Sequence, residues 1–208
     1  MLSFLDILGI EAAGRGSVLG PMVIAGVIVP EKMEKVLERM GVKDSKRLTP
    51  NRRTILSRNL KKMFDYEVVV ITAREIDEMR AEGINLNETE KNAMESILLK
   101  MKPEKAIVDA VDVKAERFQD NLCADTGINV IAEHKADDKY IQVSAASIIA
   151  KAERDDQIAQ INKEFIKSGG IGSGYPSDPK TKEFLNNYTY DEMPDFVRRS
   201  WATVAKMK

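Results

Sequence analysis

The feature that most constrains the fold is a pair of apolar runs near the start of the chain, joined by a short glycine-containing segment. The second run spans residues 21–29 and is rich in Val and Ile, and the first contains Phe4, Leu5, Ile7, Leu8 and Ile10. Continuous runs of this kind are typical of buried strands. Because little chain joins them, we predict two neighbouring antiparallel strands.

Three further segments, residues 66–71, 105–109 and 128–133, are short apolar runs bounded by polar or glycine-containing turns, and we predict strands there. Helical patterns lie between and after them. Thr49 before Pro50 predicts an N-cap and a first helical position. Asn87 with Glu90 fits a capping box. A long helix is expected over residues 144–167, and a last helical stripe is formed by Val197, Trp201 and Val204.

These elements predict an α/β protein, with a mixed five-stranded sheet, flanking helices and a C-terminal helical segment. We expect the main domain to span residues 1–168 and the C-terminal segment, residues 169–208, to pack on it. The glycine-rich piece 169–174 is the one connection that we expect to be flexible. A chain of 208 residues, 43% hydrophobic and 31% charged, is long enough to bury a stable core.

Charge and composition narrow the class of protein. The formal net charge of −1 excludes a uniformly basic nucleic-acid coat but leaves room for a local basic face. Basic clusters at 43–53 and 198–206 are expected to be mostly solvated helix faces. Cys123 is the only cysteine, no apolar run approaches a membrane span, and no signal peptide is evident. We therefore expect a cytoplasmic protein, and a monomer satisfies the sequence.

Acidic residues follow several predicted strands at their carboxyl ends, where ligands gather in open α/β sheets. They are Glu11, Asp109, and the pair Asp137 and Asp138. A single such acid would more often cap a helix or meet a lysine. Several converging acids repel one another, and a divalent cation relieves that conflict. Oxygen ligands favour Mg²⁺ or Mn²⁺, and the single histidine, His134, leaves no histidine-rich zinc site.

Residues 9–16, Gly-Ile-Glu-Ala-Ala-Gly-Arg-Gly, closely resemble the G-I-D-E-A-G-R-G signature of type 2 ribonuclease H, the ribonuclease HII family. Further segments resemble elements of that family in the family order: residues 44–46, 108–112, 134–138, 144–151, 174–178 and 198–201. Any one match could arise by chance, but the ordered set covers nearly the whole chain.

The resemblance implies a ribonuclease H-like catalytic domain that hydrolyses the RNA strand of RNA–DNA hybrids. It also implies cleavage on the 5′ side of a single ribonucleotide in duplex DNA, the chemistry of ribonucleotide excision repair. Two divalent cations would act in catalysis. Carried onto this chain, the metal-binding and catalytic carboxylates are Glu11, Asp109 and Asp137, while Ala12 stands where the family has a glutamate.

The resemblance also assigns substrate contacts. The backbone of Gly14, Arg15 and Gly16 and the hydroxyl of Tyr175 would sense the 2′-hydroxyl that separates RNA from DNA. Candidate phosphate contacts, which position a duplex without reading its sequence, are Arg15, Ser45, Lys46 and Lys151. Family members often recruit a sliding clamp through a C-terminal peptide. Residues 204–208 lack the expected aromatic pair, so we do not predict that partner.

The pair Glu11–Ala12 leaves the activity of this chain open. It fits an inactivated protein, a natural variant with a rebuilt site, or a homologue kept for binding alone; a shift of Glu11 into the role of the family's glutamate is a further possibility. Our hypothesis is that the fold and duplex binding persist while cleavage is strongly reduced. The alternative is a non-catalytic module that binds ribonucleotide-containing duplexes. A junction resolvase on the same fold is more distant, because Tyr175 and the paired glycines argue against it.

Overall fold

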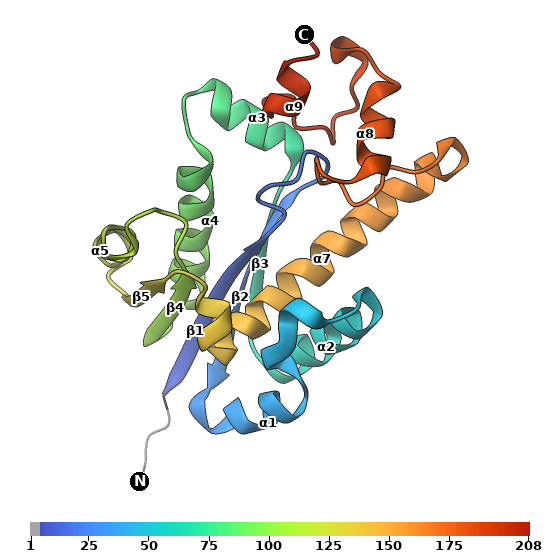
Figure 1. Ribbon diagram of the computed structural model, residues 1–208. Coiled ribbons are helices and arrows are strands. Elements are labelled where there is room, and N and C mark those ends of the chain that lie inside the picture. Colours follow the sequence, from blue (N-terminus) through green and yellow to red (C-terminus); the bar gives the residue numbers. More distant parts are fainter. Residues whose placement is uncertain (1–4) are drawn as a thin grey trace. The chain divides into compact units, whose positions relative to one another are not determined.

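The computed structural model describes residues 5–208, apart from the side chain of Asp44, so Phe4 of the first apolar run lies outside the described residues. A five-stranded sheet has the order β3-β2-β1-β4-β5 (Figure 1). Its strands are β1 (Asp6–Ala13), β2 (Met22–Pro30), β3 (Tyr66–Ile71), β4 (Lys105–Asp109) and β5 (Asn129–Glu133).

The strand pairing explains why the sheet is mixed. β4 is parallel to both β1 and β5, with Ile10 opposite Val108 and Asp109 opposite Glu133. β2 runs back along β1 in the opposite direction (Figure 1). The prediction of a mixed α/β sheet is confirmed, and the predicted strands over 66–71 and 105–109 match β3 and β4 at both ends.

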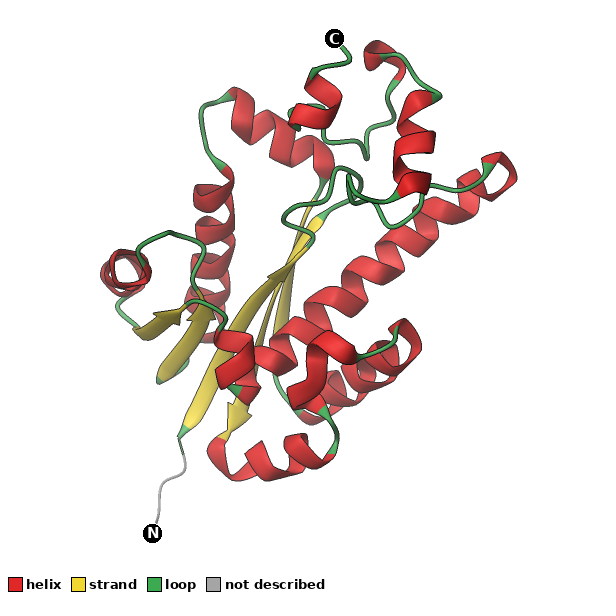
Figure 2. Cartoon of the chain, viewed as in Figure 1, coloured by secondary structure: helices red, strands yellow, loops and turns green. Residues whose placement is uncertain are grey.

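Helices occupy most of the remaining chain (Figure 2). The α-helices are α1 (Glu34–Arg39), α2 (Pro50–Met63), α3 (Ala73–Ala81), α4 (Leu86–Met101), α5 (Ala115–Thr126), α6 (Ala136–Lys139), α7 (Ile141–Phe165), α8 (Pro179–Asn186) and α9 (Ala202–Ala205). Short 3₁₀ helices span Glu31–Met33, Val42–Arg47, Ile166–Ser168 and Tyr190–Glu192. No helix among residues 5–208 is long and apolar enough to cross a membrane.

Capping residues fix where two of these helices begin. The Thr49 hydroxyl accepts a hydrogen bond from the Arg52 N–H at 3.3 Å, with Pro50 in the first turn of α2, as predicted. The predicted capping box at Asn87 is wrong. The Asn85 side chain accepts from the Glu88 N–H at 3.1 Å, so α4 starts two residues earlier. Asn87 therefore lies inside the helix, where its side chain accepts a hydrogen bond from Arg15.

The chain forms two compact units built from interleaved segments. The first unit comprises residues up to 13, 24–69 and 90–152, and the second comprises 14–23, 70–89 and 153–208. The predicted boundary between residues 168 and 169 lies inside the second unit.

The core of the first unit is the contact between β1 and α7. Leu8, Ile10 and Val108 are fully buried in the sheet. A Cβ atom added to Gly9 would lie 2.2 Å from the carbonyl carbon of Gln142, which is too close for any side chain. Gly9 therefore lets the backbone of α7 lie directly against that of β1.

The second unit has its own apolar core, formed by Val18, Leu19, Ile158, Ile171, Phe184, Leu185, Met193, Val197 and Val204. Phe165 meets Phe184 and Phe196 edge-on, with ring centroids 5.2 and 5.4 Å apart. Such edge-to-face packing adds to the stability gained by burial.

Two predictions for this unit are wrong. Val197 forms a β-bridge with Leu19 and α9 covers only Ala202–Ala205, so Val197, Trp201 and Val204 do not share one helix. The glycine-rich piece is not a loose connection either. The Asn162 side chain accepts from the Ile171 N–H at 2.9 Å, and the Thr181 hydroxyl accepts from the Gly174 N–H at 3.0 Å.

Candidate functional site

The first candidate site lies at the carboxyl ends of β1 and β4, within the first unit. Because Ile10 and Val108 are paired in register, the next residues along the two parallel strands are Glu11 and Asp109. Asp137 follows β5 on the short helix α6. The turn before α6 passes through Lys135 at φ +56°, a left-handed conformation that is uncommon for a residue other than glycine. The fold thus brings the three predicted carboxylates toward the same edge of the sheet.

Burial and mutual repulsion dominate the electrostatics of Glu11. Its pKa is raised well above the usual value, first by burial and then by the charges of Asp109 and Asp137, while Lys151 opposes the rise. Within residues 5–208, no hydrogen-bond partner meets Glu11 Oε2, which is buried. A buried carboxylate oxygen without a partner is costly, and a cation relieves that cost.

The other two acids are partly satisfied by the protein. Asp109 Oδ1 accepts a hydrogen bond from the Ala136 N–H at 2.8 Å. Burial nevertheless raises the pKa of Asp109, and the charge of Asp137 adds to the rise. Asp137 is 8% exposed, and its Oδ1 lies 3.2 Å from Lys46 Nζ. Each acid is therefore held in place with at least one side of its carboxylate close to a positive or donor group.

Lys46 and Lys151 supply the positive charges of this site. Lys46 Nζ is 2.5 Å from Asp138 Oδ1, and the hydrogen bond between them raises the pKa of Lys46 and lowers that of Asp138. Lys151 on α7 is half-buried, and burial lowers its pKa although Glu11 and Asp137 counteract this. Ser45 is 2% exposed, so its hydroxyl is buried in this structure.

The fit of this site to a metal ion is partial. In the part of the chain that the structure describes, no three Asp, Glu, His or Cys side chains are arranged so that they could hold a metal ion. The unpartnered Glu11 oxygen among repelling carboxylates still fits a divalent cation, because carboxylate oxygens are the ligands of hard cations. Ala12 contributes only a methyl group beside Glu11, so the donor set lacks the one carboxylate that the family resemblance predicts at this position.

We expect Glu11→Gln to stabilise the metal-free protein at alkaline pH. A carboxyl whose folded-state pKa is raised contributes stability below its unfolded value, and that stability is lost as pH rises through the raised pKa. Removing the buried charge should therefore raise the free energy of unfolding at pH 8 by about 1 kcal/mol, or the Tm by roughly 2–4 °C. At pH 5 the difference should shrink.

Thermal unfolding in EDTA at both pH values measures this effect, with Glu104→Gln as a control at an exposed glutamate. A Glu11→Gln variant that is less stable than the parent at pH 8 would contradict the assignment of an unpaired buried charge. Mn²⁺ should then raise the Tm of the parent more than that of the variant.

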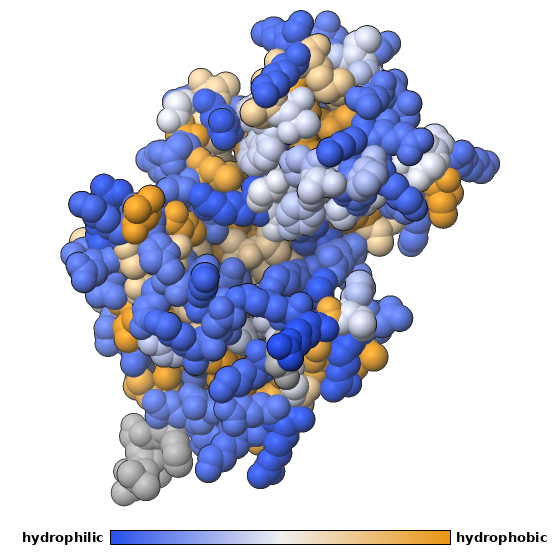
Figure 3. All heavy atoms as spheres, viewed as in Figure 1, coloured by the Kyte–Doolittle hydropathy of each residue, from blue (hydrophilic) through white to orange (hydrophobic). Residues whose placement is uncertain are grey.

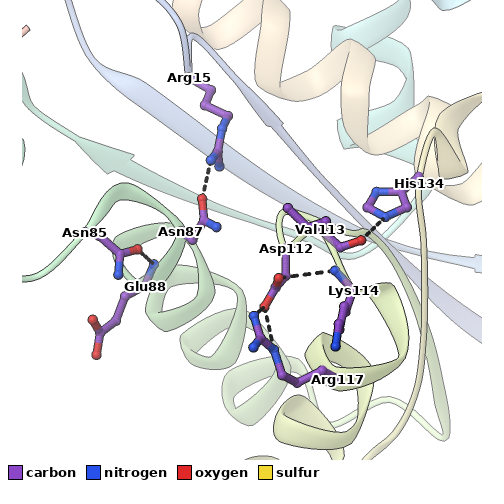
Figure 4. A network of polar contacts seen from close by, with 9 residues as sticks. All are labelled: Arg15, Asn85, Asn87, Glu88, Asp112, Val113, Lys114, Arg117 and His134. Atoms are coloured by element: carbon purple, nitrogen blue, oxygen red, sulfur yellow. Dashed lines mark hydrogen bonds and ion pairs between the residues drawn. The ribbon is translucent and has the colours of Figure 1, made fainter. Parts of the chain in front are cut away.

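The second candidate site is the loop that begins at Gly14, within the second unit. Gly14 is buried at φ +81°, and a Cβ there would lie 2.4 Å from Arg154 Nε, so only glycine fits. Gly16 differs: it is exposed, and a Cβ would meet no atom within 4 Å. Arg15 between them donates a hydrogen bond to the Asn87 side chain, as Figure 4 shows. Gly16 thus leaves an open approach to the backbone.

Tyr175 lies in the same unit and is 37% exposed. The Arg154 guanidinium sits over its ring, 4.8 Å from the centroid, a cation–π arrangement that holds the ring in place. Arg154 Nη2 also donates to the carbonyls of Leu19 and Ser173, each at 3.3 Å. The loop from Gly14 and the turn before Tyr175 are therefore joined through one buried arginine.

The ribonuclease HII family model matches residues 8–204. The chain belongs to the ribonuclease HII family. It is 77% identical to ribonuclease HII of Methanobrevibacter smithii, over 98% of this chain and 99% of that protein. It is 54% identical to ribonuclease HII of Methanothermobacter thermautotrophicus, over 98% of this chain and all of that protein. Its fold matches the crystal structure of ribonuclease H2 from Pyrococcus horikoshii with a TM-score of 0.87 and 44% identity, covering 98% and 97% of the two chains.

The predicted family and the predicted ribonuclease H-like fold are therefore confirmed. Members of this family are metal-dependent endoribonucleases. The individual site residues stay predictions. The structure brings Glu11, Asp109, Asp137, Lys46 and Lys151 together in one unit, and places the second set in the other unit: Gly14, Arg15, Gly16 and Tyr175.

Two buried arginines of the second unit were not among the predicted site residues: Arg154 and Arg198, which are 5% and 0% exposed. Arg198 belongs to the basic cluster 198–206, which was expected to be mostly solvated, but Arg198 itself is fully buried. A signal existed for Arg154, because it falls at i−4 and i−7 from Ile158 and Ile161 on the apolar stripe of α7. Figure 3 shows a visible face made mostly of hydrophilic residues, with smaller apolar areas between them.

Proposed function

We propose that this member of the ribonuclease HII family binds RNA–DNA hybrids and duplex DNA containing single ribonucleotides. It cleaves on the 5′ side of the ribonucleotide and leaves 5′-phosphate and 3′-hydroxyl ends, at a rate reduced by Ala12. The observation that carries the proposal is the buried, unpartnered oxygen of Glu11, repelled by Asp109 and Asp137. Such an arrangement marks a candidate cation site, because a cation offsets the repulsion between neighbouring carboxylates.

Glu11, Asp109 and Asp137 are the candidate ligands of Mg²⁺ or Mn²⁺, although the structure does not arrange their side chains as a group of three that could hold the ion. When bound, a pair of such ions activates water and neutralises the charge that develops on the scissile phosphate. The chain's own side chains orient the reactants. Lys151 lies near these acids, and the charges of Glu11 and Asp137 counteract the lowering of its pKa by burial. Lys46 carries an exposed ammonium group that exchanges a carboxylate partner for a substrate phosphate.

Recognition of the ribonucleotide belongs to the second candidate site. Gly16 offers its backbone without a side chain in the way, and the Tyr175 ring is held by Arg154 in a residue that is 37% exposed. A backbone N–H and a phenol together match a 2′-hydroxyl, which both donates and accepts hydrogen bonds.

Cleavage of a DNA duplex with one central ribonucleotide, in Mg²⁺ and in Mn²⁺, tests the proposal. We expect slow cleavage at the 5′ side of the ribonucleotide, mapped by end-labelling both strands, and none of an all-DNA duplex. Tight, ribonucleotide-selective binding without any cleavage would instead support the non-catalytic binding module. Ala12 and the incomplete donor set favour that second candidate.

Substituting Gly16 should separate recognition from folding. Gly16→Ala adds a methyl group in open space, so we expect an unchanged Tm but a roughly tenfold loss of preference for the ribonucleotide duplex, through obstruction of one hydrogen bond. Fluorescence anisotropy with matched duplexes measures the preference. If the Gly16→Ala protein keeps its full preference, Gly16 makes no close contact with the sugar.

A further inference from the structure

Arg198 is a charged side chain that is fully buried. It is the largest fully buried side chain of the described residues, and within residues 5–208 no carboxylate forms an ion pair with it. Its guanidinium instead lies over the Trp201 ring, 4.7 Å from the centroid. Burial lowers its pKa to about 9, so it remains charged at neutral pH. Burying a cation is costly unless it is well hydrogen-bonded, so its partners show what it stabilises.

Those partners are carbonyl groups of a single loop. Nη2 donates to the Gly14 oxygen at 2.8 Å, Nη1 donates to the Arg15 oxygen at 3.0 Å, and Nε donates to the Gly20 oxygen at 3.1 Å. The Arg198 N–H also donates to the Val18 oxygen at 2.9 Å. One residue from the C-terminal part of the chain therefore holds both ends of the loop.

The direction of these bonds determines where the loop's donors point. The backbone has no cis peptide bond, and in a planar trans peptide the C=O and the following N–H point in opposite directions. Two consecutive carbonyls, those of Gly14 and Arg15, point at the guanidinium. The N–H groups of Arg15 and Gly16, which belong to the same two peptides, must point away from it.

We propose that Arg198 is a positioning residue for ribonucleotide recognition, which orients the N–H groups of Arg15 and Gly16 so that they donate to the ribose 2′-hydroxyl. The inference rests on the proposed function. It assigns the orientation of the two donors to the guanidinium fork, whose planar geometry can meet two neighbouring carbonyls at once. A lysine at this position has a single ammonium group and cannot hold both carbonyls in that way.

The test compares affinities for two duplexes that differ only in one central 2′-hydroxyl, measured by anisotropy in EDTA with the full chain. We expect Arg198→Lys to reduce the ratio of the two affinities about tenfold, with affinity for the all-DNA duplex unchanged. Leu185→Ala is the matched control, because it truncates the core of the same unit without touching the loop carbonyls. It should lower the Tm and keep the ratio.

Ser17→Ala gives an independent variant that should fold even if Arg198→Lys does not. The Ser17 hydroxyl donates to the same Gly14 oxygen at 2.8 Å, so its loss should reduce the ratio by about twofold to threefold. A parent chain without any preference for the ribonucleotide would overturn the proposed function and this inference with it. A selective parent whose Arg198→Lys or Ser17→Ala variant keeps the full ratio would overturn the inference alone.

Discussion

A protein carrying Glu11→Asp and Ala12→Glu is expected to cleave a DNA duplex with one ribonucleotide at least about 100-fold faster than the chain with Glu11 and Ala12. The longer Glu11 side chain places its carboxylate differently from an aspartate, and a displacement of about 1 Å in such a site costs on the order of 10²-fold in rate. The added glutamate also restores negative charge that holds a second cation. Single-turnover cleavage in Mg²⁺ measures the effect.

The single variants and one control separate these causes. Glu11→Asp alone should restore the position of the carboxylate at residue 11 but not the missing negative charge at residue 12. Ala12→Glu alone should restore that charge but leave the carboxylate of residue 11 displaced. Each single variant should therefore cleave more slowly than the double variant. Ile166→Glu, which adds an acid at a position that is 66% exposed in the other unit, should leave the rate unchanged. Equal rates for the parent and the double variant would show that Glu11 already fulfils the metal-binding role and that Ala12 costs nothing.

The strands were the part of the fold that local sequence predicted best. β3 and β4 are apolar runs bounded by polar residues, and each matches its predicted range residue for residue. The order of the strands in the sheet could not be predicted in this way. Parallel neighbours such as β1 and β4 are far apart in the chain, and periodicity carries no information about which strands pair. The family resemblance implied the ribonuclease H-like fold but gave no strand order.

The C-terminal part shows where helical spacing misleads. Val197 and Val204 are both buried, but one is buried by a β-bridge and the other by a short helix. Burial at a helical interval therefore arose from tertiary packing of two different elements. The same holds for Arg198, since its partners are backbone carbonyls of a loop about 180 residues earlier, which no pattern of side chains reveals.

The sequence indicated which acidic residues belong to the candidate metal site, but not which other side chains contact them. Strand ends indicated Glu11 and Asp109, and the charge of Asp109 contributes to the raised pKa of Glu11, as the expected repulsion requires. The sequence could not show that Lys46 lies against Asp137 and Asp138, or that Ser45 is buried. These contacts depend on how the 3₁₀ helix Val42–Arg47 packs, which is a property of the first unit as a whole.

Gly9→Ala is expected to be the most destabilising single methyl addition in the first unit. The added Cβ would lie 2.2, 2.3 and 2.6 Å from the Gln142 carbonyl carbon, the Gln142 oxygen and the Val143 nitrogen. All three are backbone atoms of α7, so no change of rotamer relieves the overlap, and β1 must move away from the helix. We expect a loss of about 4 kcal/mol or more in the free energy of unfolding, or roughly 10 °C in Tm.

Gly16→Ala is the matched control. It adds the same methyl group, but at Gly16 a Cβ atom meets no other atom within 4 Å, so the Tm should stay unchanged. Urea unfolding of both variants gives the comparison, and a Gly9→Ala protein as stable as the Gly16→Ala protein would contradict the close packing of β1 on α7.

The effect of Gly9→Ala extends to the candidate metal site, because β1 carries Glu11 and α7 carries Lys151. Separating the two elements by even part of a methyl diameter weakens the attraction between that carboxylate and that ammonium group. In the double variant Glu11→Asp, Ala12→Glu, adding Gly9→Ala should therefore reduce cleavage even at temperatures where the protein remains folded.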